Sequence, residues 1–199
     1  MSNGTTRPDP VHLGRFLAMV AILLLAACTA RGPRPEETKP LQTIPALDIP
    51  RYMGVWYEVA KYPNHFQTQC AGGTSATYSP QPEGRVPEGR VKVVNRCQTK
   101  AGGWDEVVGE ARQVGGSGSA KLEVRFAPAW LSWLPMVWGQ YWVIDLDPEY
   151  QLAAVSEPSR TYLWILSRTP VVAPEAYRSL LDRLREQGFD LSRLEASGP

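Results

Sequence analysis

Short runs of alternating hydrophobic and polar residues fill most of the chain after residue 50. In the run 121–126 (KLEVRF), Leu122, Val124 and Phe126 share one face of an extended strand and the charged residues share the other. Clusters rich in Gly and Pro separate these runs, as turns separate strands. The pattern predicts eight short strands, at residues 55–62, 73–79, 90–98, 104–114, 120–126, 139–145, 151–155 and 161–168. Such regular short strands are typical of an all-β antiparallel sandwich or barrel.

One segment near the C-terminus has the period of a helix, at residues 174–187. Its apolar stripe comprises Tyr177, Leu180, Leu181 and Leu184. Pro174 suits the first turn of a helix, and Gly188 can end one in the left-handed conformation. The run 162–166 (YLWIL) is hydrophobic on both faces, and a strand buried on both faces needs a cover. We therefore expect one amphipathic helix on the outside of the sheet, over the last strands.

The first 28 residues have the features of an export signal. Residues 16–27 (FLAMVAILLLAA) carry no charge, and as a helix they would be about 18 Å long, too short for a hydrocarbon core of about 30 Å. The sequence Leu25-Ala26-Ala27-Cys28 then resembles the lipobox of bacterial lipoproteins. This resemblance implies cleavage before Cys28 and acylation of its thiol. The alternatives are an ordinary signal peptide with a chance cysteine and a buried apolar helix.

The residue after the cysteine is Thr29. An Asp at this position would resemble the signal that retains lipoproteins in the inner membrane. We therefore expect a protein anchored by lipid to the outer membrane and facing the periplasm. The Pro-rich polar run that follows has no period and predicts a flexible tether. The predicted organisation is a signal peptide at 1–27, lipidated Cys28 and tether at 28–46, one folded domain at 47–192 and a polar tail at 193–199.

Composition fits one globular domain and gives no sign of a nucleic-acid partner. Hydrophobic residues make up 43% and charged residues 21%, which are ordinary values. Lys and Arg number 21 and Asp and Glu 20; without Arg7, Arg15 and Asp9 of the export signal, the two signs balance. No basic excess remains to attract nucleic acid. Seven Trp and eight Tyr are many for this length, and aromatic rings often line apolar pockets.

Acylation of Cys28 would leave a pair of cysteines, Cys70 and Cys97. An exported protein is in an oxidising compartment, and the two residues flank an apparent hairpin centred near residues 83–86. We predict a disulfide between them; two buried free thiols are the alternative. No Cys or His neighbours have the spacing of metal ligands, so we predict neither a metal nor a cofactor.

Three short motifs resemble those of the lipocalin family. Gly54 and Trp56 form a G-x-W signature at the start of the first strand. Asp147 and Tyr150 lie where the second motif of the family has an acidic–aromatic step, although the usual T-D-Y form is absent. Arg168 matches the third motif, an arginine that closes the eighth strand. A single G-x-W recurs by chance, but its coincidence with eight strands, this arginine and a lipobox is specific.

The resemblance covers about residues 47–192, and the run 141–170 is similar to the bacterial outer-membrane lipocalins. It implies an eight-stranded antiparallel up-and-down barrel with one C-terminal α-helix packed on the outside. Trp56 is then expected to plug the closed end of the barrel, with Arg168 across its ring. These motif residues are expected to be structural and not to touch a ligand.

The same resemblance implies a cup that binds and carries or stores a small apolar ligand for membrane maintenance, such as a fatty acid or a lysophospholipid. Candidates for the cavity wall are taken from strand faces. Glu58, Ala60 and Tyr62 are on the same face of the first strand as Trp56. The candidates from the other strands are Thr77, Val93, Val108, Leu122, Val124, Tyr141, Val143 and Trp164.

The run 127–138 (APAWLSWLPMVW) is apolar and uncharged. In the lipocalin layout it lies at the open mouth, between the fifth and sixth strands. Its candidate contact residues are Trp130, Trp133, Leu134, Met136 and Trp138. Three interpretations are open: the loop meets a membrane, it folds over the mouth as a lid, or it pairs two protomers into a homodimer.

No nucleophile–base pair or catalytic motif is visible, and His65 is the sole histidine after residue 28. We therefore do not expect an enzyme. Two alternatives are a lipocalin-fold enzyme that acts on a lipid-like substrate and a structural lipoprotein whose barrel is filled by its own side chains.

Overall fold

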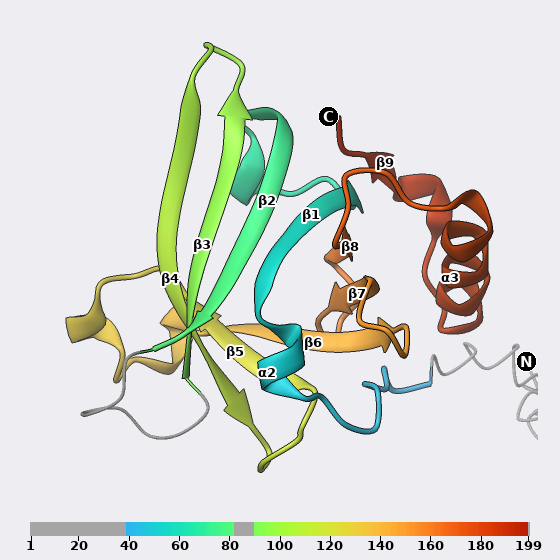
Figure 1. The fold of residues 1–199 in the computed structure, drawn as a ribbon. Coiled ribbons are helices and arrows are strands. Elements are labelled where there is room, and N and C mark those ends of the chain that lie inside the picture. The colour runs from blue at the N-terminus through green and yellow to red at the C-terminus, as the bar shows by residue number, and fades with distance from the viewer. Residues whose placement is uncertain (1–38, 82–89, 199) are drawn as a thin grey trace, which may run out of the picture. The chain divides into compact units, whose positions relative to one another are not determined.

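A computed structural model describes residues 39–81 and 90–198, and the structural statements below concern these residues (Figure 1). The predicted signal peptide, Cys28, the first part of the predicted tether and the turn near residues 83–86 lie outside the described residues. Within the described ranges, no helix combines the length and the hydropathy needed to cross a bilayer.

Eight strands form one antiparallel sheet that closes on itself. They are β1 (Gly54–Lys61), β2 (Cys70–Pro80), β3 (Arg90–Thr99), β4 (Trp104–Val114), β5 (Lys121–Arg125), β6 (Gly139–Leu146), β7 (Leu152–Ser156) and β8 (Leu163–Ser167). Each strand pairs with its neighbour in sequence, and β1 pairs with both β2 and β8. This pairing confirms the predicted up-and-down barrel, and closure leaves these strands without an open sheet edge.

The C-terminal tail adds a ninth strand, β9 (Glu195–Ala196), beside β1. Pairing of β1 with β2 ends at Tyr57 and Ser75. Beyond that point the tail takes the place of β2: Ser197 N donates to Val59 O at 2.9 Å. The prediction of a tail outside the folded domain is therefore wrong, because the free backbone of β1 recruits it.

The predicted helix is α3 (Pro174–Glu186), and it lies on the outside of the barrel (Figure 1). Leu180 and Leu184 are fully buried against the outer faces of β1 and β6–β8. The helix ends as expected: Gly188 has a φ of +86°, and Phe189 N donates to Leu184 O at 3.1 Å. The shorter helices are α2 (Ile49–Tyr52), η1 (His65–Gln67), η2 (Ala129–Leu131), η3 (Pro135–Val137) and η4 (Leu191–Arg193).

The folded unit begins earlier than predicted. Leu41 and Leu47 are buried, and Ile44 N donates to Val143 O at 3.0 Å. The chain is therefore docked along the barrel from Lys39 onward, and the expectation of a tether as far as residue 46 is wrong. The apolar side chains responsible are few and are separated by Pro and polar residues, which hid them in the sequence pattern.

Candidate ligand cavity

Trp56 seals one end of the barrel. Its ring is fully buried, and its Nε1 donates to Tyr52 O at 2.9 Å. The guanidinium carbon of Arg168 lies 4.0 Å from the ring centroid, a cation–π contact worth about 0.5–2 kcal/mol. Arg168 also donates to three backbone carbonyls, those of Arg51, Val55 and Tyr150. This is the arrangement that the first and third motifs imply.

The remaining motif residues shape the backbone around this closed end. Gly54 has a φ of +99°, and a Cβ there would lie 3.1 Å from an Arg168 nitrogen. The Asp147 carboxylate accepts from the backbone N–H of Glu149 and Gln151 at 3.0 and 2.6 Å, which fixes the turn between β6 and β7. The motif residues therefore brace the barrel, and none of them lines the cavity.

A cavity of about 1110 Å³ occupies the barrel beyond Trp56, large enough for a single lipid chain with its polar end. Six of the eleven predicted wall residues line it: Glu58, Val93, Leu122, Val124, Tyr141 and Trp164. Five do not: Ala60, Tyr62, Thr77, Val108 and Val143.

For Thr77 and Val108, the prediction took the wrong face of the strand to point into the barrel. Their neighbours Ala76, Tyr78 and Val107 line the cavity, so these two side chains point out of the barrel. The stretch 107–108 (VV) is apolar at both positions, which left its inner face ambiguous in the sequence.

A bulge explains the placement of Ala60 and Tyr62. The register of β1 against β8 shifts between Glu58 and Ala60, which reverses the face that the following residues present. Both side chains lie in the outer core, the cluster of buried residues between the barrel wall and α3. Val143 is buried in the same cluster as Trp56, inside the barrel, but it does not line the cavity. The sequence carried no glycine or other signal at the bulge.

Three tyrosines that share a hydroxyl chain line the cavity near its closed end. Tyr52 and Tyr78 each place their hydroxyl 2.9 Å from that of Tyr141. Tyr52 also packs on the closing indole, and its ring centroid lies 4.9 Å from that of Trp56. Of the three, sequence analysis selected Tyr141 alone: Tyr52 lies in a helix and not in a strand, and Tyr78 was missed because its neighbour Thr77 was assigned to the inner face. The floor is thus aromatic, with its hydroxyls satisfied among themselves.

Stability should fall in alkaline solution because of these buried phenols. Burial raises the pKa of Tyr52 and Tyr141 well above 10 and that of Tyr78 to about 12. In the unfolded chain the same groups ionise near pH 10. Their contribution is therefore complete below about pH 10 and is lost as the pH rises towards 12. Urea titrations across this range should show the fall, and Tyr78→Phe should reduce it; a flat stability profile would contradict the placement.

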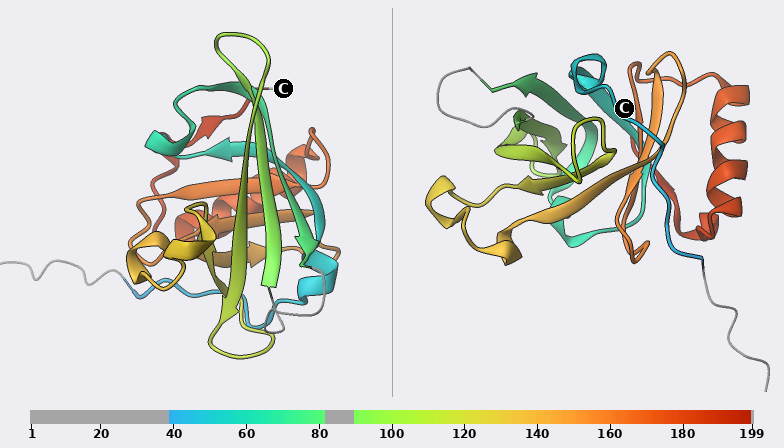
Figure 2. Two further views of the ribbon diagram at one scale, coloured as in Figure 1. Left: turned by 90° about the vertical axis from the view of Figure 1, so that its left-hand side faces the viewer. Right: turned by 90° about the horizontal axis from the view of Figure 1, so that it is seen from below.

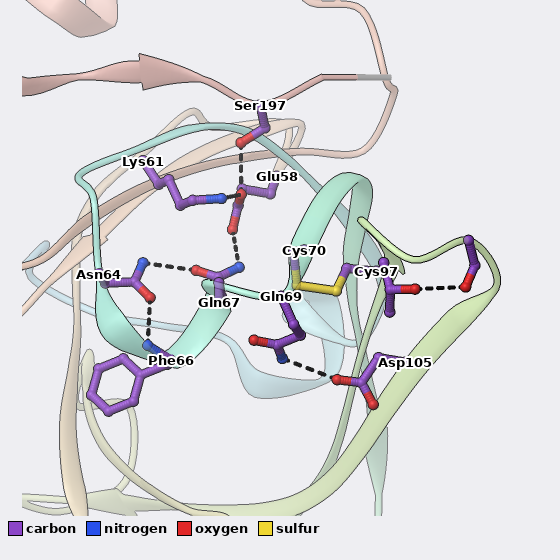
Figure 3. The surroundings of a disulfide bond; sticks show 12 residues. Glu58, Lys61, Asn64, Phe66, Gln67, Gln69, Cys70, Cys97, Asp105 and Ser197 are labelled. Atoms are coloured by element: carbon purple, nitrogen blue, oxygen red, sulfur yellow. Dashed lines mark hydrogen bonds and ion pairs between the residues drawn. A yellow bond between two sulfur atoms is a disulfide. The ribbon is translucent and has the colours of Figure 1, made fainter.

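A polar network lies in the wall nearer the mouth (Figure 3). The Glu58 carboxylate is buried and accepts from Lys61 Nζ at 2.7 Å, Gln67 Nε2 at 2.7 Å and Ser197 Oγ at 2.6 Å. The side-chain oxygen of Gln67 accepts from Trp164 Nε1 at 3.1 Å. Glu58 is thus charge-compensated by Lys61 and tied to the C-terminal tail. Sequence analysis found Glu58 but not its partners: Lys61 lies on the same strand, Gln67 in the following loop and Ser197 in the tail.

The predicted disulfide is confirmed. Cys70 and Cys97 are joined across β2 and β3, with Cα atoms 5.6 Å apart (Figure 3). Both residues line the cavity. The bond links the two strands near the end of their hairpin that lies away from the closing indole.

Removal of this bond should cost stability. It closes a loop of 27 residues, for which the chain-entropy relation gives about 3.5 kcal/mol. The double variant Cys70→Ser, Cys97→Ser should lose about that much free energy of unfolding in a denaturant titration. Wild-type protein unfolded with and without reductant supplies the matched comparison. Equal stability with and without the bond would contradict the prediction.

In the described part of the chain, no group of three His, Cys, Asp or Glu side chains lies close enough together to bind a metal ion. His65 packs on Phe66, with ring centroids 3.9 Å apart. What the described geometry offers is therefore a hollow with apolar walls and a few satisfied polar groups. Fold and cavity together define a barrel that binds a small molecule in its interior.

Comparison with known proteins narrows this class. The model of the Lipocalin-like domain family matches residues 47–198. Temperature-induced lipocalin-1 of Arabidopsis thaliana is 39% identical over 160 residues, which cover 79% of this chain and 82% of the relative. Outer membrane lipoprotein Blc of Escherichia coli K12 is 33% identical over 177 residues, with 88% and 90% covered. The chain belongs to the lipocalin family.

Solved structures agree on the fold. Insecticyanin from the tobacco hornworm superposes with a TM-score of 0.61 at 18% sequence identity, covering 83% of this chain and 88% of that one. This likeness supports the barrel architecture alone, because the sequences have diverged too far to carry a ligand from one protein to the other.

Proposed function

We propose that this protein is a lipid-anchored envelope lipocalin that binds and carries or stores a fatty acid or a lysophospholipid. The observation that carries the proposal is the open 1110 Å³ cavity, whose floor and walls are largely apolar. Burial of apolar ligand surface contributes about 25 cal/mol per Å², before the cost of ordering the ligand. A single acyl chain provides enough such surface and is slender enough for a barrel of eight strands.

The polar groups of the cavity support a ligand with one polar end. Gln67, Gln69, Asn95 and Arg96 line it together with Glu58, all on β1–β3 or the loop between β1 and β2. The opposite end is floored by aromatic rings. An amphiphile with its chain towards Trp56 and its polar end near these side chains satisfies both regions.

The proposed location is the outer membrane. It is supported by the sequence at Cys28 and by the relatives from Escherichia coli, Citrobacter freundii and Vibrio cholerae that are named Outer membrane lipoprotein Blc. The mouse relative named Apolipoprotein D is 32% identical over 155 residues and also has a name that links it to lipid. We propose a binding role and not an enzymatic one, in line with the names of these relatives.

A fluorescent polyene fatty acid, cis-parinaric acid, tests the ligand class. Titration of residues 29–199 should give saturable binding with one site and a Kd in the micromolar range or tighter. Palmitate and lysophosphatidylethanolamine should displace the probe, whereas a short polar acid such as succinate should not. Absence of saturable binding would favour the filled-barrel alternative and contradict the proposal.

The lipid anchor needs a separate test. Cells that express the full chain should incorporate labelled palmitate into it, and the label should disappear in Cys28→Ser. Cys70→Ser with Cys97→Ser is the matched control, because the two residues are bonded to each other and should leave labelling unchanged. Labelling that survives in Cys28→Ser would contradict the anchor.

A further inference from the structure

The loop between β5 and β6 holds large apolar side chains in water. Trp130, Trp133 and Met136 are 74%, 75% and 85% exposed. The whole run 127–138 carries no charged residue. Trp138, by contrast, is buried, and Leu134 is half-buried, so these two residues support the loop and do not face solvent.

This exposure is built into the fold. Trp138 stacks on Arg112 at 4.0 Å on the outer face of the barrel, and its Nε1 donates to Ser132 O at 2.8 Å. Arg125, which is itself buried, donates to Ala127 O and so holds the start of the loop. Between these two anchor points lie the short turns η2 and η3, each preceded or begun by a proline. A braced loop of this kind presents its tryptophans outward instead of folding over the cavity.

The loop lies at the mouth of the cavity. Met136 and Val137 belong to this loop and also line the cavity. The exposed apolar surface of the loop therefore continues directly into the cavity. Phe66 in η1, which also lines the cavity, is 56% exposed. In the left view of Figure 2, η1, η2 and η3 lie at one side of the barrel and α2 at the other. Two separate loops therefore carry apolar side chains around one opening.

We propose that this loop docks the protein on a lipid bilayer, with Trp130, Trp133 and Met136 in the interface and the cavity mouth against the membrane. Indole rings suit the boundary between water and hydrocarbon, and an uncharged loop enters it without burying a charge. The inference goes beyond ligand binding and does not depend on acylation of Cys28.

The geometry favours a bilayer over a second copy of the chain. A specific protein interface buries about 800 Å² on each partner and needs complementary surfaces. The most exposed aromatic side chains, Trp130 and Trp133, are on a narrow loop beside a hollow, which a fluid interface can accommodate and a rigid partner would leave partly unfilled. Docking at this place also gives an apolar ligand a path from membrane to cavity that avoids water.

Vesicle flotation of residues 29–199 without a lipid anchor tests the proposal. The described unit 39–198 holds a closed barrel and both cores, so it does not need the anchor to fold. Vesicles are made of phosphatidylethanolamine with phosphatidylglycerol, or of phosphatidylcholine alone. Trp130→Ser with Trp133→Ser should lower the partition coefficient at least about tenfold on both. Because the loop is uncharged, about 0.5 M NaCl should change the partition of the wild-type protein little.

A matched control removes exposed apolar side chains from the opposite end. Val55 and Val171 flank the closed end near Arg168 and are 41% and 82% exposed. Val55→Ser with Val171→Ser should float like the wild type. The proposal is overturned if the wild type fails to float, or if the tryptophan variant partitions unchanged. It is also overturned if that variant only abolishes a dimer seen without lipid in sedimentation, or only alters the affinity for cis-parinaric acid.

Discussion

Two tryptophans placed inside the barrel should abolish ligand binding while the fold survives. Ala76 and Val93 lie on adjacent strands and both line the cavity. Ala76→Trp with Val93→Trp would put two indoles into the space that an acyl chain needs. The affinity for cis-parinaric acid should fall at least about a hundredfold, equivalent to about 2.7 kcal/mol of lost binding free energy. Far-ultraviolet circular dichroism should show that the sheet is retained, since the cavity is open to receive the rings.

The chain offers a closely matched control for this variant. Thr77 and Val94 are the next residues along the same two strands and lie opposite each other in the ladder. Their side chains point out of the barrel, so Thr77→Trp with Val94→Trp adds the same two rings to the outer surface. This control should bind the probe as the wild type does. The assignment of the cavity would be contradicted if both variants lost binding equally, or if both still bound the probe.

Trp56→Ala should destabilise the barrel more than any other single substitution at its closed end. The ring is fully buried and contacts both Tyr52 and Arg168. Its loss leaves a hole at the closed end and removes the surface on which the guanidinium rests. Large-to-small changes of buried aromatic residues cost about 3–5 kcal/mol, and a cost of that size should appear in a urea titration.

The control is another tryptophan at a different place in the fold. Trp130 is largely exposed, so Trp130→Ala should change the free energy of unfolding by less than about 0.5 kcal/mol. Arg168→Met should lie between the two variants, because it leaves three backbone carbonyls without their donor. Similar losses for Trp56→Ala and Trp130→Ala would mean that the closing role of Trp56 is wrong.

Much of the fold was predictable because its signals are local. Alternation marks the strands, as in 121–126, and the apolar stripe and Gly188 mark the outer helix. The cysteine pair followed from counting and from the hairpin between them. Closure into a barrel did not follow from alternation, which fits a sandwich equally well; it rested on the motif residues Trp56 and Arg168.

What the sequence did not show depends on contacts between distant segments. The bulge after Glu58 reverses a strand face without any local signal, which is why Ala60 and Tyr62 were assigned to the cavity. The tail strand exists because β1 and β2 part, a consequence of how the barrel curves. Residues 39–46 join the domain through a few apolar side chains in a Pro-rich run. Two of the three partners of Glu58 are Gln67 in a loop and Ser197, 139 residues away.

The most direct measurement is native mass spectrometry of the protein extracted in mild detergent from its own membrane. The account predicts one additional bound mass, the size of a single-chain lipid, that denaturation releases as a fatty acid or a lysophospholipid. The same mass should be absent from Ala76→Trp with Val93→Trp. A bare polypeptide mass, or an unchanged bound mass in that filled variant, would contradict the claim that this barrel holds an apolar guest.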